Sequence, residues 1–100
     1  MKIVAVTACP TGIAHTYMAA EQLEKTGKAL GHEIKVETQG AMGIENELSA
    51  SDIKNADFVI FAVDIEVEQR DRFEGRKIVE VPVQEAIKNP NGVFAKLLGK

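Results

Sequence analysis

Residues 7–21, TACPTGIAHTYMAAE, hold the side chains of this chain that are best suited to chemistry. They include Cys9, the single cysteine among 100 residues, with Thr11, His15 and Thr16 following it closely. The thiolate form of cysteine is a strong nucleophile. Hydroxyl and imidazole groups can donate hydrogen bonds to an anion. These residue types at this spacing therefore indicate a nucleophilic sulfur beside a site for an anion.

The elements around this segment fit such a site. Residues 2–7, KIVAVT, form an apolar run that is typical of a strand buried on both faces, and the pattern becomes helical from about residue 15 to residue 30. The first backbone N–H groups of a helix have no partner within the helix, so phosphate binds well there and a nearby thiolate is favoured. Gly12 allows the tight turn that this loop needs. No Lys or Arg occurs between Lys2 and Lys25. The negative charge of a bound anion would therefore have to be stabilised mostly by neutral backbone and side-chain dipoles.

Several cysteine chemistries compete for this segment. Thioredoxin-like redox chemistry needs a second cysteine at the position of Gly12 and is disfavoured. A phosphatase loop needs an arginine clamp at the position that His15 occupies. Without a clamp, the sulfur is better suited to receiving a phosphoryl group and passing it on. From the residues alone, a phosphoryl carrier, a phosphatase and a binding module that senses a nucleotide or phosphate without chemistry all stay open. Cys9 could also be a small buried residue at the end of a strand.

The rest of the chain alternates between strands and helices. We expect strands at residues 33–38, at an edge of the sheet, and at 57–63 and 76–81. We expect one helix at residues 51–55, capped by Ser51, and a second at residues 82–88 with Pro82 in its first turn. A third helix is expected at about residues 93–98. This alternation predicts one α/β domain over residues 1–100, a doubly wound four-stranded parallel sheet with helices on both faces. The simplest strand order that right-handed crossovers allow is 2-1-3-4.

That order opens a crevice at the carboxyl ends of strands 1 and 3, where ligands usually bind. Cys9 and Asp64 follow these two strands directly, and Gln39 and Gly40 follow strand 2. Asp64 is expected to cap the connection after its strand rather than to face the sulfur, because a carboxylate opposes ionisation of a neighbouring thiol. Gln39 is expected either to belong to a turn or to donate a hydrogen bond beside the cysteine loop.

A few residues elsewhere carry weaker signals. Arg70 and Arg72 are expected to be solvated surface side chains rather than phosphate ligands. Phe73 is expected in the core. His32 follows Gly31, the predicted C-cap of the first helix, and is expected to be exposed.

The composition excludes several classes of function. A net charge of −3 argues against a nucleic-acid or anionic-membrane surface. No apolar run approaches the roughly 20 residues that span a bilayer, and a strand beginning at residue 2 leaves no room for a signal peptide. A single cysteine fits a reducing cytosol. No cluster with the spacing of metal ligands is present, so we expect neither a metal nor a cofactor.

Residues 7–21 closely resemble the phosphorylation-site segment of the fructose-type enzyme IIB component of the bacterial phosphoenolpyruvate-dependent sugar phosphotransferase system. The likeness continues through VETQGAMG, DIKNADFVIFAVD and the RF, EG and RK pairs, so it covers most of the chain to about residue 81. It implies a fructose-type (type-2) EIIB domain with a four-stranded, Rossmann-like parallel sheet. The chain would be either a separate subunit or one domain of a larger permease.

The resemblance also implies a role for each site residue. Cys9 would accept a phosphoryl group from a phosphohistidine of a IIA partner and transfer it to a sugar bound by a membrane-embedded IIC partner. The sugar would be fructose or a related hexose, and the protein would work in the cytoplasm, transiently at the inner face of the membrane. The implied phosphate cradle consists of Pro10, Thr11, Gly12, Ile13, Ala14, His15 and Thr16. Gln39 and Asp64 are candidates for supporting residues around this cradle because of their places after strands 2 and 3, and not because of the resemblance.

Overall fold

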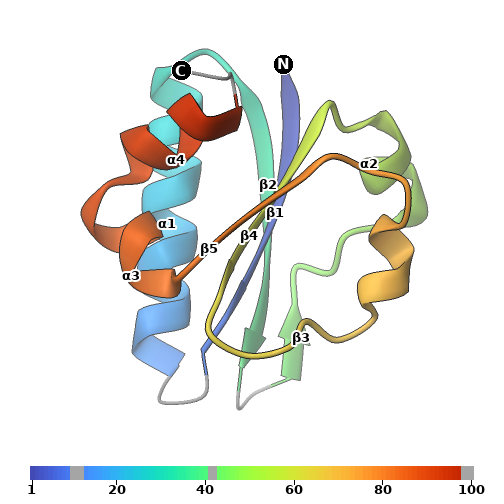
Figure 1. The fold of residues 1–100 in the computed structure, drawn as a ribbon, viewed down its shortest axis with the longest axis horizontal. Helices are drawn as coiled ribbons and strands as arrows, with labels where there is room; N and C mark the ends of the chain where they lie inside the picture. Colours follow the sequence, from blue (N-terminus) through green and yellow to red (C-terminus); the bar gives the residue numbers. More distant parts are fainter. Residues whose placement is uncertain (10–12, 41–42, 98–100) are drawn as a thin grey trace.

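A central sheet, covered by helices on both faces, organises the molecule (Figure 1). The computed structural model describes residues 1–9, 13–40 and 43–97. Helices α1, α3 and α4 cover one face of the sheet, and α2 with the short 3₁₀ helix η1 covers the other (Figure 1). The elements run in the order β1 (Lys2–Ala8), α1 (Ile13–Ala29), β2 (Glu33–Gly40), β3 (Gly43–Glu45), α2 (Ala50–Asn55), β4 (Phe58–Val63), η1 (Arg70–Phe73), β5 (Ile78–Val81), α3 (Val83–Lys88) and α4 (Pro90–Leu97).

The sheet confirms the predicted parallel topology and adds a strand to it. Its order is β3-β2-β1-β4-β5, in which β2, β1, β4 and β5 are parallel and β3 pairs antiparallel with β2. Without β3 this is the expected order 2-1-3-4. The prediction that residues 33–38 form an edge strand was wrong, because β3 covers that edge. A three-residue strand that starts at Gly43, with φ of +90°, looks like a loop in the sequence.

Strand β1 is the centre of the core and is buried along nearly its whole length. Its side chains alternate between two apolar clusters, because successive residues of a strand point to opposite faces. Ile3 and Ala5 pack with α1, α3 and α4, whereas Val4 and Val6 pack with α2 and η1. Phe73 of η1 is fully buried in the second cluster, as predicted. We call these sides of the sheet the α1 face and the α2 face.

Helix α1 ends one residue earlier than the sequence suggests. Gly31 has φ of +83° and caps the helix as predicted, while the N–H of His32 donates to the carbonyl of Gly27 at 2.9 Å. Leu30, expected as the last residue of the helix, therefore lies in the cap and is 48% exposed. His32 was expected to be exposed, but it is half-buried and stacks on Phe94 with ring centroids 6.0 Å apart.

Two other helix starts differ from the prediction. Ser49, not Ser51, caps α2: its hydroxyl accepts from the N–H of Asp52, whose carboxylate accepts from the N–H of Ser49. This reciprocal capping box satisfies two backbone donors, which is why the cap lies two residues before the expected position. Pro82 precedes α3 as its N-cap rather than forming its first residue.

A buried ion pair ties the α2 face together. Glu37 of β2 is fully buried, and its two carboxylate oxygens accept hydrogen bonds from the two Nη atoms of Arg72, each at 2.9 Å. The same carboxylate accepts from the N–H of Leu48 at 2.9 Å and from Nε2 of Gln39 at 2.7 Å. The expectation that Arg72 is a solvated surface side chain was therefore wrong. Burial by itself raises the pKa of Glu37, but the hydrogen bonds from Arg72, Leu48 and Gln39 outweigh it and hold that pKa below its ordinary value.

We predict that Glu37→Ala lowers the free energy of unfolding by about 3–5 kcal/mol, because it leaves the guanidinium of Arg72 without its carboxylate. Denaturation in urea at neutral pH measures this difference. The matched control is Glu33→Ala, on the same strand but exposed, which should change stability by less than about 0.5 kcal/mol. Equal effects of the two substitutions would contradict the prediction.

The lowered pKa of Glu37 predicts a dependence of stability on pH. A carboxyl group whose pKa is lower in the folded protein stabilises the fold above its unfolded-state pKa, and this contribution is lost as the pH falls through the folded-state value. The stability advantage of the wild type over Glu37→Gln should therefore be constant above about pH 5 and shrink as the pH falls below about 4. Thermal unfolding of both proteins across this range tests the prediction, and an advantage that grows on acidification would refute it.

Candidate functional site

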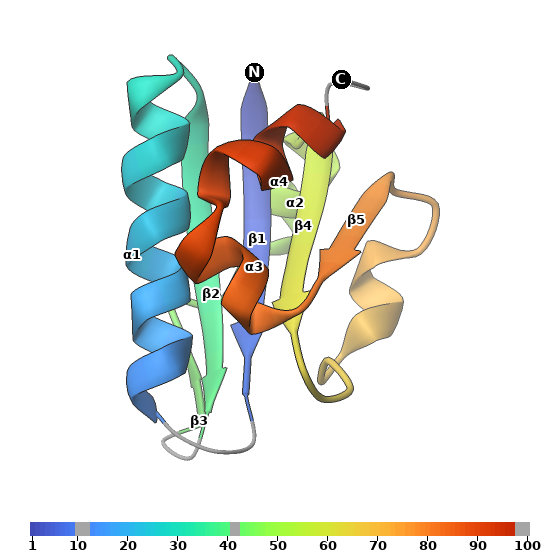
Figure 2. The same cartoon turned by 60° about the vertical axis from the view of Figure 1, so that its left-hand side comes forward.

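The carboxyl ends of the two central strands meet at one edge of the sheet. Strands β1 and β4 run in the same direction toward the end of the sheet where α1 begins (Figure 2). Their register pairs Ala8 with Val63, and the N–H of Asp64 donates to the carbonyl of Ala8 at 3.0 Å. Cys9 and Asp64 follow these residues directly, so the structure brings them side by side, as the predicted crevice required.

Cys9 lies at the boundary between the core and this edge. It is 7% exposed and belongs to the apolar cluster of the α1 face. Its thiol also makes a polar contact, because Sγ donates to Oδ2 of Asp64 at 3.8 Å. The sulfur thus combines an apolar environment with a direct carboxylate neighbour.

Asp64 connects Cys9 to a third element. Its Oδ1 accepts from the backbone N–H of Val83, the first residue of α3, at 3.2 Å, while Oδ2 faces the thiol. The expected capping role is present, but it serves α3 and not the connection that follows β4. The sequence posed capping and contact with the sulfur as alternatives, and the two carboxylate oxygens carry out both.

The start of α1 lies next to Cys9 in the chain. The helix begins at Ile13, and Ala14 and His15 are exposed in its first turn. Thr16 is 1% exposed, and its carbonyl accepts from Oγ1 of Thr7 at 3.1 Å. Pro10, Thr11 and Gly12 of the predicted cradle lie outside the described residues. The structure therefore positions the helix N-terminus of the predicted anion site and places His15 at its surface.

Gln39 does not lie beside the sulfur. It pairs with Ala8 across β2 and β1, and its side chain points to the α2 face, opposite to the cluster that contains Cys9. Its Oε1 accepts from the N–H of Glu68 at 2.8 Å, and its Nε2 donates to the carbonyl of Glu68 at 3.1 Å. Gln39 is therefore neither a turn residue nor a donor to the cysteine loop, but an anchor for the connection that begins at Asp64.

The three arginines of the chain are all bound on the α2 face. Arg70 pairs with Glu80 at 3.1 Å and lies over the ring of Phe61, and Arg72 pairs with Glu37. Arg76 donates through Nη1 to the carbonyls of Lys54 and Ala56. As expected, Arg70 and Arg72 are not placed as phosphate ligands, although the reason is their carboxylate partners and not simple solvation.

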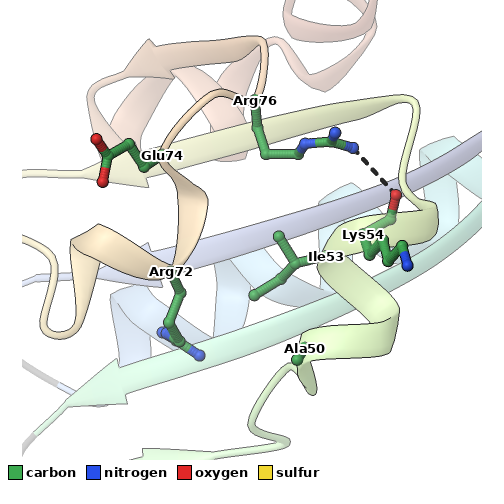
Figure 3. A pocket seen from close by; sticks show the side chains of 6 residues that line it. All are labelled: Ala50, Ile53, Lys54, Arg72, Glu74 and Arg76. Carbon is green, nitrogen blue, oxygen red and sulfur yellow. Dashed lines mark hydrogen bonds between the residues drawn. The ribbon is translucent and has the colours of Figure 1, made fainter.

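A hollow of about 320 Å³ also lies on the α2 face, between α2 and residues 72–76 (Figure 3). The side chains of Ile53, Arg72 and Arg76 face it, and the guanidinium of Arg76 reaches across to the carbonyl of Lys54 (Figure 3). The lining residues are Ala50, Ile53, Lys54, Arg72, Glu74 and Arg76. This hollow is separated from Cys9 by the sheet, so it is not part of the candidate site.

In the part of the chain that the structure describes, no group of three or more His, Cys, Asp or Glu side chains is arranged to hold a metal ion. No helix within those ranges has the length and apolar character that crossing a bilayer requires.

Comparison with known proteins places the chain in a family. Residues 4–96 match the family model described as PTS system, Lactose/Cellobiose specific IIB subunit, where PTS denotes the phosphotransferase system. The chain is 53% identical over 96 residues to the PTS system fructose-like EIIB component 2 of Escherichia coli K12, an alignment that covers 96% of this chain and 91% of that protein. It is 50% identical over 99 residues to a fructose-like EIIBC component of the same organism, covering 97% of this chain and 20% of that longer protein.

Solved structures agree with these relatives. A domain of the fructose-specific IIABC component of Borrelia burgdorferi superposes with a TM-score of 0.92 at 47% identity, covering 97% of this chain and 92% of that one. An enzyme IIB subunit from Escherichia coli K12 superposes with a TM-score of 0.91 at 45% identity, covering 97% and 90%. The family model names lactose and cellobiose, whereas these relatives are named for fructose or as fructose-like, and the high identity to them over the whole domain decides the type. The chain therefore belongs to the IIB family of the sugar phosphotransferase system, as a component of the fructose-like type.

Proposed function

We propose that Cys9 is the residue that carries the phosphoryl group in this IIB component. The observation that supports this most is its position, because the single thiol of the chain follows β1 at the carboxyl edge of the sheet and shortly precedes the N-terminus of α1 in the sequence. Ligands of open parallel sheets bind at this edge. A nucleophile placed there can receive a phosphoryl group whose charge is stabilised by helix N–H groups.

The transfer takes place in two displacements. Sγ of Cys9 attacks the phosphorus of a phosphohistidine on a IIA partner, and the bond from phosphorus to nitrogen breaks. A hydroxyl of the sugar, held by a IIC membrane partner, then attacks the same phosphorus, and the bond from phosphorus to sulfur breaks. Charge builds up on the equatorial oxygens in both steps, where preorganised N–H donors stabilise it. The donors proposed for this role come from the loop and first turn formed by Pro10, Thr11, Gly12, Ile13, Ala14, His15 and Thr16.

The partners follow from the place of IIB components between a phosphoryl donor and a permease. The relative in which a IIB segment is fused to a IIC component supports a permease as the acceptor side. We therefore propose that residues 1–100 act as one IIB domain in the cytoplasm, transiently at the inner face of the membrane. The sugar proposed is fructose or a related hexose, recognised by the IIC partner, and no metal or cofactor takes part in the transfer.

The positions of the three arginines support the role of a phosphoryl carrier over that of a phosphatase. A cysteine phosphatase holds its phosphate with a bidentate arginine. Here Arg72 is held by Glu37, Arg70 by Glu80 and Arg76 by backbone carbonyls, all on the α2 face. A phosphoryl group that lacks this clamp is bound less firmly, which suits its transfer to a second acceptor.

The test is phosphorylation of the purified protein by a phosphoenolpyruvate-driven chain that ends in a fructose-type IIA protein. We expect the mass of one phosphoryl group on the peptide that contains Cys9, and loss of this label to background in Cys9→Ser and Cys9→Ala. Ser51→Ala, which removes an exposed hydroxyl far along the chain, serves as the control and should label fully. Full labelling of Cys9→Ala would refute the proposal.

A further inference from the structure

The contact between Cys9 and Asp64 has a use in the proposed reaction. An ionised carboxylate is only an acceptor, so in the contact of 3.8 Å the thiol is the donor and Oδ2 the acceptor. The sulfur must lose this proton before it can bond to phosphorus. We propose that Asp64 is a catalytic residue that takes up the thiol proton through Oδ2 and keeps it while Cys9 carries the phosphoryl group. This inference rests on the proposed function.

The backbone around Asp64 fixes its carboxylate for this role. The N–H of Asp64 is bound to the carbonyl of Ala8, and Oδ1 is bound to the N–H of Val83. The residue is thus held through its backbone N–H and through Oδ1, which leaves Oδ2 directed at the sulfur. A contact of 3.8 Å is long, but catalytic hydrogen bonds are often long before the partner binds.

The connection after Asp64 is held in place from the other face of the sheet. Both polar atoms of the Gln39 amide bind the backbone of Glu68, and the same amide donates to Glu37. Glu37 is in turn bound by Arg72. Residues 64–68 are therefore anchored at both ends, and the carboxylate of Asp64 keeps a defined position relative to Cys9.

The negative charge of the phosphoryl group favours a protonated Asp64 beside the phosphorylated Cys9. A phosphorylated cysteine places two negative charges on the phosphoryl oxygens, and an ionised carboxylate in contact with the same sulfur would repel them. If Asp64 holds the thiol proton, it is neutral while the phosphoryl group is present. It can then donate a hydrogen bond to that group instead of repelling it.

The protons and electron pairs balance in both steps. In the first, the S–H proton moves to Oδ2, the S–P bond forms, and the P–N bond breaks with its electron pair passing to the donor imidazole, whose other nitrogen already carries a proton. In the second, a sugar oxygen bonds to phosphorus and releases its proton to water, while the P–S bond breaks and the sulfur takes back the proton from Oδ2. Asp64 ends the cycle ionised, as it began.

The first test is the rate of a single phosphoryl transfer from a phosphorylated IIA protein to Asp64→Asn at neutral pH. Asparagine keeps an oxygen that can accept from Val83, so α3 stays capped, but it cannot accept a proton. We expect a loss of about 10²-fold in rate, the usual contribution of a general acid–base group. The matched control is Glu66→Gln, which removes the same charge two residues away from a side chain that is 79% exposed and bound to Arg70, and it should keep the wild-type rate.

A second measurement reports the proton itself. The ¹³C resonance of the Asp64 carboxyl should have the shift of a carboxylate in the unmodified protein and of a carboxylic acid once Cys9 is phosphorylated. A merely structural role for Asp64 would leave this resonance unchanged. A carboxylate signal in the phosphorylated protein, or a wild-type transfer rate in Asp64→Asn, would overturn the inference while the proposed function stands. If the wild type takes no phosphoryl group on Cys9, both fall together.

Discussion

The in-register parallel pairing of β1 with β4 is the constraint on which the site depends. Because Ala8 is paired with Val63 and its carbonyl accepts from the N–H of Asp64, the two strands end at the same level. A shift of one residue would turn the side chains that follow to the opposite faces of the sheet. The buried, apolar character of both strands fixes this register, so the packing of the core also sets the distance between the sulfur of Cys9 and the carboxylate of Asp64.

The two faces of the sheet contribute different parts of the same arrangement. The α1 face supplies the apolar cluster around Cys9 and the helix that follows it in the chain. The α2 face supplies a polar network in which Glu37 binds Arg72 and Gln39 binds the backbone of Glu68. A buried ion pair adds little to net stability by itself, but losing one partner is costly. The network thus acts mainly to fix the connection that starts at Asp64.

The distribution of charge in the fold keeps the three arginines away from the sulfur of Cys9. The guanidinium groups lie across the sheet from the sulfur, bound to carboxylates or carbonyl oxygens. A negatively charged side chain, Asp64, touches the sulfur instead. If Cys9 carries a phosphoryl group, as proposed, backbone dipoles rather than arginines would hold it, so its transfer to another acceptor would not require a strong ion pair to break.

The sequence by itself determined the features that local patterns encode. The apolar runs predicted the four parallel strands, and the right-handed crossover rule predicted their order. Gly31 predicted the end of α1, and residues 7–21 singled out Cys9 as the candidate nucleophile. Only the tertiary structure decided which side chains meet across long stretches of chain. Glu37 and Arg72 are 35 residues apart, Gln39 and Glu68 are 29 apart, and Asp64 and Val83 are 19 apart, so no local pattern pairs them. Such polar pairs form because burial forces each donor and acceptor to find a partner, and the fold alone determines which partner is within reach.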